Sequence, residues 1–355
     1  MSRTQGFNLI FHSIRPGGGM ERHVLDLIAY ASSKGISVRV VTRKLAWPDA
    51  PSEHVEFVVI RDQTPFSRLN NYLFENRALT RCNLDWPTIA VSRVPGAQLA
   101  IVGGTHLAHL VDRGKKHYGF FDRAMIRRER ALYHGARKII SHSARVAGEI
   151  VEHYGIAQEK VVTLYPPVDT AKFSLAARHS RDQLRQSLGV EPDQMLLLFP
   201  SNNHVLKGSD LILSALSACS PRYRLAVAGK NPLDAKGVIN LGFRQDMPEL
   251  YAAADAVILA SHYEAFGLVG PEAILCGTPV IFSTTVGAVE VLSQTACMSF
   301  QRNTRALQQA LEEALNRFDN DTLEIKDPSS HILYPYTLAQ HFDSLFAMLD
   351  LPQKQ

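Results

Sequence analysis

The sequence has few cysteines and no long apolar run, and both absences restrict the kind of protein it encodes. The chain of 355 residues contains four cysteines, which lie far apart and form no Cys-x-x-Cys pair. This spacing fits neither a zinc site nor a disulfide framework, and it indicates a reducing compartment. The first apolar run, residues 7–11, is too short for a signal peptide, and no stretch approaches the ~18 apolar residues that cross a bilayer. We therefore expect a cytoplasmic protein, which leaves open a position on a membrane surface.

Charge is also scarce overall but unevenly distributed. The net charge is only +4, yet residues 1–170 carry 23 basic against 15 acidic residues, or +8, and residues 171–355 carry 15 against 19, or −4. A hydrophobic content of 46% and a mean hydropathy of −0.07 exclude a collagen, a disordered tail and a coiled coil. The length exceeds the roughly 250–300 residues at which single cores stop growing. Two domains with different partners are therefore expected.

Short apolar runs alternate with amphipathic segments in both halves, which is the pattern of parallel sheets with crossover helices. In the first half, strands are expected at residues 7–11, 38–41, 55–60, 88–91, 99–102, 138–141 and 161–164, with a helix at 21–33. In the second half, strands are expected at 195–199, 224–228, 238–241, 256–259 and 279–282, with helices at 178–188, 209–218, 247–253, 272–276, 304–318 and 337–349. The run 165–169 (YPPVD) breaks the alternation and is the predicted boundary between two Rossmann-type domains.

A glycine-rich loop follows the first expected strand, but it lacks the spacing of a dinucleotide fingerprint. Residues 12–22 read HSIRPGGGMER. Counted from Gly17, the last glycine of G-x-G-x-x-G would fall on Arg22, and no acidic ribose ligand follows in the valine-rich segment 38–41. A hydride-transfer enzyme is therefore disfavoured. The loop either brings backbone amides to a phosphate or is a tight turn without a ligand.

Two carboxylates in the second half, Glu264 and Glu272, are separated by seven residues. Glu264 follows an expected strand, and Pro271 suits the first position of a helix, so Glu272 would lie in its first turn. The loop between them would present amide groups at the carboxyl edge of the sheet, where anionic ligands bind in open α/β folds. One carboxylate can accept hydrogen bonds from ribose hydroxyls and the other from sugar hydroxyls. This arrangement favours a nucleotide sugar over a simple phosphate.

Lys207 supplies a third element at the same edge. It lies between the expected strand at 195–199 and the helix that begins at Ser209, so its ammonium can reach a diphosphate. A single Lys-Gly pair is more often a solvated helix start. Three such elements at corresponding strand ends favour a ligand site.

In this order, the motifs resemble those of the retaining glycosyltransferases of family 4, which have the GT-B fold. Residues 18–21 are similar to a G-G-x-E element, 202–208 to Arg-x4-Lys-Gly, 264–272 to E-x7-E, and 242–256 to a run of the form G…pelyaaAD. The resemblance spans nearly the whole chain. It implies two Rossmann-like domains that face each other across a cleft.

The resemblance also implies the domain limits. Residues 1–168 would form the acceptor domain, with the C-terminal helix, residues 335–355, packed back on it. Residues 169–334 would form the nucleotide-sugar donor domain.

The same resemblance implies roles for individual residues. Lys207 would neutralise the diphosphate leaving group, Glu264 would contact the donor sugar, and Glu272 would hold the donor ribose. His106 would be the polar side chain beside the reacting carbon, with His109 as its alternative, unless His106 merely caps or packs. The other donor-binding residues would be Gly18, Gly19, Asn202, Gly229, Phe243, Arg244, Phe266, Gly267 and Leu268.

One departure from the family pattern concerns the diphosphate. Asn202 stands where the family usually has arginine, as it does in a subset that builds lipopolysaccharide cores. The candidate substitutes for the missing charge are His204, Arg15 and Arg22.

The resemblance implies transfer of a hexose-type sugar, with retention of configuration, from a nucleoside-diphosphate sugar to a glycan or lipid-linked acceptor such as lipopolysaccharide core. UDP-sugars are the first choice of donor. Fixed amides, a helix dipole and Lys207 would stabilise the charge on the leaving phosphate, so no metal ion and no other cofactor is expected.

A basic stretch in the first half points to the acceptor side. Residues 113–145 contain ten Lys and Arg but only two acids, with Tyr118, Phe120 and Phe121 interleaved. This composition suits an anionic membrane surface or the phosphates of a lipid-linked glycan, although a plain solvated helix face is the alternative. The candidate surface residues are Arg113, Lys115, Lys116, Arg123, Arg127 and Arg128.

Three rival functions remain. A nucleotide-sugar epimerase on the same fold would need no acceptor. A non-catalytic binding protein would not need Glu264, Glu272 and Lys207 together. A basic lipid- or nucleic-acid-binding module would bind with a steep salt dependence, but the chain has no nucleic-acid motif, and nucleic acid is not an expected partner.

Overall fold

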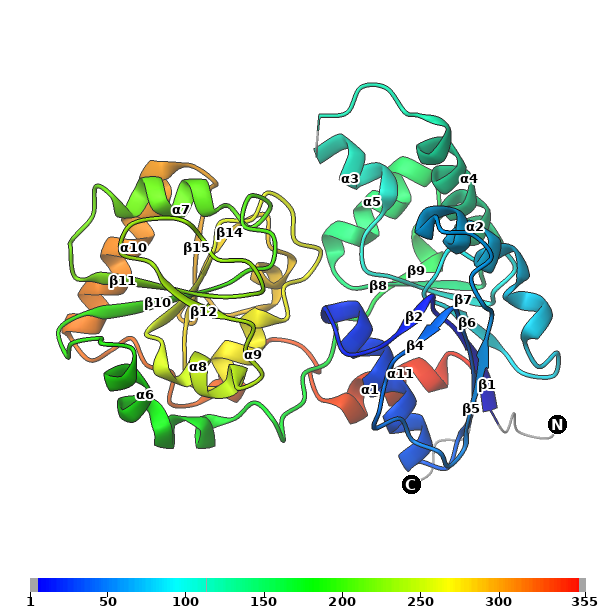
Figure 1. Ribbon diagram of the computed structural model, residues 1–355, viewed down its shortest axis with the longest axis horizontal. Coiled ribbons are helices and arrows are strands. Elements are labelled where there is room, and N and C mark those ends of the chain that lie inside the picture. The colour runs from blue at the N-terminus through cyan, green and yellow to red at the C-terminus, as the bar shows by residue number, and fades with distance from the viewer. Residues whose placement is uncertain (1–5, 113, 351–355) are drawn as a thin grey trace. The chain divides into compact units, whose positions relative to one another are not determined.

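The computed structural model describes residues 6–112 and 114–350, and the chain divides into two compact units (Figure 1). Unit 1 consists of Met1–Pro167 and Pro335–Gln355, and unit 2 consists of Val168–Tyr334. The chain thus passes from unit 1 to unit 2 within the proline-containing run at 165–169, and it returns to unit 1 at Pro335.

Unit 1 is built on a seven-stranded sheet in the order β5-β3-β1-β6-β7-β8-β9, with parallel pairing throughout. Its strands are β1 (Gly6–Ile10), β3 (Ser37–Thr42), β5 (Val55–Val59), β6 (Thr88–Ala90), β7 (Leu99–Val102), β8 (Lys138–Ser141) and β9 (Val161–Thr163). A separate two-stranded ribbon pairs β2 (Ser13–Ile14) with β4 (Lys44–Leu45). The strand order reverses between β1 and β6, which makes this point of the carboxyl edge a switch point of the kind where α/β proteins bind ligands.

The helices of unit 1 follow the strands in a doubly wound arrangement. They are α1 (Gly19–Ser33), α2 (Ser67–Arg77), α3 (His106–Asp112), α4 (Phe120–Gly135), α5 (Ala144–Tyr154) and α11 (Leu338–Ala347). Helix α11 packs beside α1, although more than 300 residues separate them in sequence (Figure 1). Phe342 and Phe346 of α11 enter the same buried cluster as Phe7 of β1, and Tyr30 donates a hydrogen bond of 2.9 Å to Asp343. Helix α11 is therefore part of the unit 1 core.

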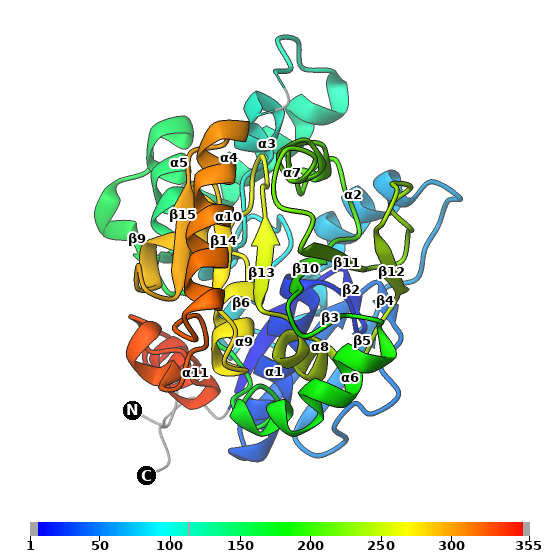
Figure 2. The same ribbon diagram turned by 90° about the vertical axis from the view of Figure 1, so that its left-hand side faces the viewer.

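Unit 2 has a six-stranded parallel sheet in the order β12-β11-β10-β13-β14-β15. The strands are β10 (Met195–Pro200), β11 (Tyr223–Ala228), β12 (Ile239–Gly242), β13 (Ala256–Leu259), β14 (Val280–Ser283) and β15 (Cys297–Phe300). The helices are α6 (Arg181–Ser187), α7 (Ser209–Leu216), α8 (Met247–Ala253), α9 (Val269–Leu275) and α10 (Thr304–Asp319). Helices α7 and α10 cover one face of the sheet, and α6, α8 and α9 cover the other (Figure 2).

The structure adds elements that the sequence pattern did not reveal. Helices α2, α3, α4 and α5 and strands β2, β4 and β15 were not expected. Helix α2 is largely polar and buries only Asn70, Phe74 and Glu75, so it has no continuous apolar stripe to recognise. Helix α9 begins at Val269, so Pro271 is its third residue rather than its first.

Two features of the structure relate to the expected compartment: the state of the cysteines and the length and apolar character of the helices. All four cysteines have free thiols in the structure. Across residues 6–112 and 114–350, no helix combines the length and the apolar character of a bilayer span.

Candidate active site

Lys207 and Glu264 meet at the carboxyl edge of the unit 2 sheet. The segment after β10 pairs with the segment after β13, since the Ala260 amide donates to the Lys207 carbonyl at 3.2 Å and the His262 amide donates to the Leu206 carbonyl at 3.0 Å. Gly208 permits this approach: its φ is +79°, and a Cβ there would lie 2.0 Å from the Ala260 carbonyl oxygen. The Lys207 ammonium consequently contacts the Glu264 carboxylate in a half-buried ion pair.

The loop that follows Glu264 is held by a neighbouring segment. The amides of Gly287 and Ala288 donate to the carbonyls of Glu264 and Phe266 at 3.0 and 2.7 Å. Gly267 has a φ of +95°, and a Cβ there would lie 2.8 Å from the Val286 side chain. The backbone of the predicted donor-binding residues at 266–268 is therefore fixed before any ligand arrives.

Glu272 lies in α9 with only 2% of its surface exposed. The Tyr251 hydroxyl, from α8, donates to its carboxylate at 3.0 Å, and the Thr278 hydroxyl donates to the Tyr251 carbonyl at 2.7 Å. Tyr251 was absent from the predicted site, although its position in the pelyaaAD-like run was a signal for it. It acts by orienting the carboxylate expected to hold the ribose.

Asn202 is engaged within the protein. Its side-chain oxygen accepts a hydrogen bond of 3.0 Å from the backbone amide of Lys230. Gly229, which precedes Lys230, lies so close to the same segment that a Cβ there would be 1.8 Å from the Ser201 carbonyl oxygen. Asn202 thus ties the end of β10 to the end of β11.

His204, a candidate substitute for the missing positive charge, is held by two contacts within unit 2. Its Nε2 lies 3.0 Å from the Asn231 carbonyl, which only accepts, so Nε2 carries the proton. Its Nδ1 lies 2.9 Å from the Ser201 hydroxyl, and both ring nitrogens are therefore engaged within the protein. The backbone of Lys230 lies beside Asn202, and its ammonium stands 5.9 Å from the centre of the Phe243 ring.

Two of the predicted donor-binding residues, Phe243 and Arg244, differ in their surroundings. Phe243 is 63% exposed at the end of β12, a position open to stacking. Arg244 donates to Asp246 with an Nε–Oδ1 distance of 2.7 Å, and this contact lowers the pKa of the Asp246 carboxyl. The Arg244 guanidinium is thus already paired with a carboxylate within the chain.

In unit 1, the structure places Gly18, Gly19 and His106 at helix N-termini. Gly18 is the residue before α1, and Gly19 is its first residue. His106 is the first residue of α3, and its Nε2 lies 3.2 Å from the Asp122 carboxylate. His109 lies one turn later, where its backbone amide donates to the Thr105 carbonyl at 3.2 Å.

The basic surface predicted for residues 113–145 is smaller than expected. Arg113 lies outside the described residues. Arg128 does not belong to an exposed surface, because it is only 8% exposed, stacks on the Tyr72 ring at 4.1 Å and pairs with Glu75 at 3.6 Å. Arg128 lies on the inward side of the amphipathic helix α4 and faces α2. Its positive charge alone wrongly suggested an exposed position.

What remains exposed on α4 and the segment before it is a mixed basic and aromatic surface. Phe120 is 83% exposed, with the Phe121 ring 6.1 Å away. Lys115 is engaged with Asp122 at 2.6 Å. The other exposed Lys and Arg residues of this surface are Lys116, Arg123, Arg127 and Arg130.

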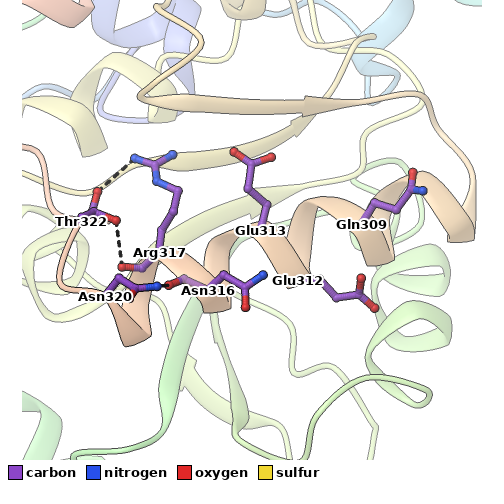
Figure 3. Close-up of a pocket in the computed structure, with 7 residues that line it drawn as sticks. All are labelled: Gln309, Glu312, Glu313, Asn316, Arg317, Asn320 and Thr322. Carbon is purple, nitrogen blue, oxygen red and sulfur yellow. Dashed lines mark hydrogen bonds between the residues drawn. The ribbon is translucent and has the colours of Figure 1, made fainter.

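A cavity of about 390 Å³ lies elsewhere, along α10 (Figure 3). Its lining is polar and contains none of the predicted site residues; it consists of Gln309, Glu312, Glu313, Asn316, Arg317, Asn320 and Thr322. The chain's Asp-x-Asp sequence, Asp319 to Asp321, ends the same helix, and Asp319 pairs with Arg222 at 2.6 Å. In the part of the chain that the structure describes, no group of three or more His, Cys, Asp or Glu side chains is arranged to hold a metal ion.

Comparisons of the sequence identify its relatives. Residues 17–172 match the family model described as Glycosyltransferase Family 4, and residues 194–317 match the one described as Glycosyl transferases group 1. A probable transglycosylase of Burkholderia thailandensis is 32% identical over 341 residues, which cover 94% of both chains. A D-inositol 3-phosphate glycosyltransferase of Catenulispora acidiphila is 33% identical over 190 residues, which cover 46% of this chain and 45% of the relative.

Solved structures share the fold. WaaG, a glycosyltransferase involved in lipopolysaccharide biosynthesis, aligns with a TM-score of 0.82 and 18% identity over 97% of this chain and 99% of its own. Anabaena HepE, in complex with UDP and glucose, aligns with a TM-score of 0.72 and 18% identity over the same shares. The predicted GT-B fold with two parallel-sheet domains is thus confirmed. Together with the family matches, this shows that the chain is a glycosyltransferase and belongs to glycosyltransferase family 4.

Proposed function

We propose that this enzyme transfers a hexose-type sugar, with retention of anomeric configuration and without a metal ion, from a nucleoside-diphosphate sugar to a glycan or lipid-linked acceptor such as lipopolysaccharide core. A UDP-sugar is the preferred donor. The observation that carries the proposal is the ion pair of Lys207 with Glu264 at the same sheet edge as the buried Glu272. The relatives support it, because HepE was solved with UDP and glucose and WaaG acts in lipopolysaccharide biosynthesis.

Lys207 and Glu264 have different roles once the donor binds. When the donor binds, Lys207 turns from Glu264 to the diphosphate and stabilises the negative charge that develops as the anomeric bond breaks. Glu264 is then available to accept hydrogen bonds from the sugar hydroxyls. The departing phosphate takes the proton of the acceptor hydroxyl, so the reaction needs no separate base.

Unit 1 is proposed to bind the acceptor and to offer His106 to the substrate. The exposed basic and aromatic surface of α4 supports an anionic, lipid-linked acceptor at the cytoplasmic face of a membrane. Lys116, Arg123 and Arg127 would contact anionic headgroups or the phosphates of the acceptor.

Product analysis tests the proposal. The enzyme is incubated with each of UDP-, ADP- and GDP-glucose, with and without lipopolysaccharide core from a strain with a truncated core, and nucleoside diphosphate and sugar products are separated by chromatography. We expect release of nucleoside diphosphate that depends on the acceptor. Conversion of the donor to another nucleotide sugar without acceptor would favour the epimerase instead. No turnover of any donor would contradict the proposal.

A further inference from the structure

We propose that Asp122 is a positioning residue for His106: its carboxylate fixes the imidazole ring as the Nε2–H tautomer and leaves Nδ1 to accept a hydrogen bond from a substrate hydroxyl. The inference rests on the role proposed for His106. It adds a residue of α4 that belongs to none of the motifs in the sequence, and it states which ring nitrogen faces the substrate.

The backbone of His106 is held first. Its amide, at the start of α3, donates to both oxygens of the Glu129 carboxylate at 3.0 and 3.1 Å. The next two amides donate to the Tyr154 hydroxyl at 3.4 Å and to the Thr105 hydroxyl at 3.2 Å. The amides at a helix start have no partner inside the helix, and here the first three are all bound by side chains.

The Glu129 carboxylate, which binds the His106 amide, is itself held by several partners. Glu129 lies in α4 and is almost fully buried. Arg93, from the segment after β6, donates to it from Nε at 2.8 Å, and the Tyr154 hydroxyl of α5 also contacts it. A buried carboxylate with this many charged and hydrogen-bonding partners keeps a fixed place. The start of α3 is thus tied to α4, α5 and the sheet, and only the side-chain torsions of His106 remain to be set.

Asp122 sets those torsions. Its Oδ1 lies 3.2 Å from Nε2 of His106, while its Oδ2 accepts from Lys115 at 2.6 Å and from the Gly119 amide at 3.0 Å. The Lys115 ammonium, the largest influence, lowers the pKa of the Asp122 carboxyl to about 2, so the group is ionised at neutral pH. An ionised carboxylate has no proton to donate, so Nε2 of His106 must carry one.

The consequence concerns the other ring nitrogen. In a neutral imidazole, one nitrogen donates and the other accepts, and the hydrogen bond made by the first decides which. With Nε2–H directed at Asp122, Nδ1 presents a lone pair. In the neutral ring, this nitrogen can accept a hydrogen bond from a sugar or acceptor hydroxyl. The His106 side chain is 21% exposed.

Nitrogen-15 NMR of histidine-labelled protein measures the tautomer without requiring activity. The His106 signal is assigned by its loss in His106→Asn. We expect a single Nε2–H tautomer in the wild type and the mixed state of a solvated ring in Asp122→Ala. The matched control is Asp112→Asn, which removes an ion pair with Arg145 at the other end of α3 without touching the ring. An Nδ1–H ring in the wild type, or an unchanged ring in Asp122→Ala, would overturn the proposal.

Kinetics then separates positioning from mere support of the fold. We expect Asp122→Ala to lower kcat about tenfold or more while leaving donor KM unchanged, because misplacing a group at the reacting centre costs turnover rather than binding. Asp122→Glu should restore part of the loss, Asp112→Asn should behave as wild type, and Asp122→Ala should add nothing in a His106→Ala background. Wild-type kcat in Asp122→Ala, or full additivity, would contradict the positioning role. If the wild type transfers no sugar, the proposed function fails, and NMR alone decides the tautomer.

Discussion

At the scale of single residues, the ion pair between Lys207 and Glu264 joins two side chains that are 57 positions apart. The pair depends on Gly208, since any side chain there would collide with the Ala260 carbonyl. In the ligand-free enzyme each charge neutralises the other. The two charges proposed to bind the donor are therefore neither of them half-buried and unpaired before the donor arrives.

Replacing Lys207 tests the role of that ammonium. We expect Lys207→Met to lower kcat by roughly 100-fold or more, because an electrostatic contact with a charge that develops in the transition state is lost. The measurement is steady-state transfer with the preferred donor. Lys236→Met, an exposed lysine of the same unit, is the control and should keep wild-type kcat. Equal rates in the two variants would exclude Lys207 from the reaction.

Tyr251 offers a finer test of the ribose site. Tyr251→Phe removes the hydrogen bond to Glu272 but leaves the ring in place. We expect nucleotide affinity to fall about five- to tenfold, as for one lost hydrogen bond to a charged group. The comparison is Tyr223→Phe, which removes a hydrogen bond of 2.7 Å to the Leu311 carbonyl elsewhere in unit 2. Equal nucleotide dissociation constants for the two variants would contradict the assignment.

At the scale of elements, three buried histidines lie where α11 packs against the rest of unit 1. His23 of α1 lies between His142, which follows β8, and His341 of α11, with ring centroids 4.8 and 5.0 Å away. His341 donates from Nδ1 to the Tyr165 carbonyl at 2.8 Å. Burial lowers the pKa of each ring: to about 4 for His142, to about 3 for His341, and well below 6.5 for His23.

These histidines predict that unit 1 loses stability in acid. Below pH 6.5 the rings are neutral in the folded state but protonated in the unfolded state. Protonation of the unfolded state therefore lowers the free energy of unfolding as the pH falls below 6.5, and the histidines have no such effect above that pH. His142 and His341 each cost about 2 kcal/mol by pH 5, and His23 acts in the same direction. Glu75 opposes them, since burial raises its pKa to about 7 and its protonation in the same range stabilises the fold. The net effect is a loss.

Urea unfolding at about pH 7 and about pH 5 measures this loss. Both tryptophans, Trp47 and Trp86, lie in unit 1, so their fluorescence reports on that unit. We expect the free energy of unfolding to fall by a few kcal/mol at the lower pH. His142→Phe should reduce the difference between the two values. An unfolding free energy that is equal or higher in acid would contradict the account.

Helix α4 makes a separate prediction. If its exposed face binds anionic lipid, the protein should co-sediment with vesicles containing one quarter phosphatidylglycerol at low salt and be released at high salt. The double variant Arg123→Glu, Arg127→Glu should bind several-fold less. Arg305→Glu, an exposed arginine of unit 2, is the control. If the wild type does not bind at low salt, or if all variants bind equally, the exposed face of α4 is not a lipid-binding surface.

At the scale of the whole molecule, the fold could be predicted because buried parallel strands are continuous apolar runs. The apolar runs at 195–199 and 256–259 could be identified as strands without any information on tertiary contacts. The short β15 and the polar α2 could not be recognised, because neighbours in the fold stabilise them. Arg128 shows the same limit, since nothing in the sequence distinguishes its inward position on α4 from the outward one of Arg127.

The site could be predicted only as far as its motifs extend. Lys207, Glu264 and Glu272 follow from strand ends and spacing, because carboxyl ends of parallel strands meet at one edge. Asp122 lies 16 residues from His106, and only the turn before α4 brings them together. The engagement of Asn202 with Lys230 likewise depends on how two loops meet.

The central claim is that unit 2 binds a nucleoside-diphosphate sugar through Lys207, Glu264 and Glu272, and calorimetric titration with UDP tests it most directly. The account predicts one binding site per chain in the wild type. It predicts that Glu272→Gln weakens binding by about tenfold or more, since a carboxylate that accepts ribose hydroxyls is neutralised. If neither UDP nor ADP nor GDP binds, or if Glu272→Gln binds as tightly as the wild type, the claim is wrong.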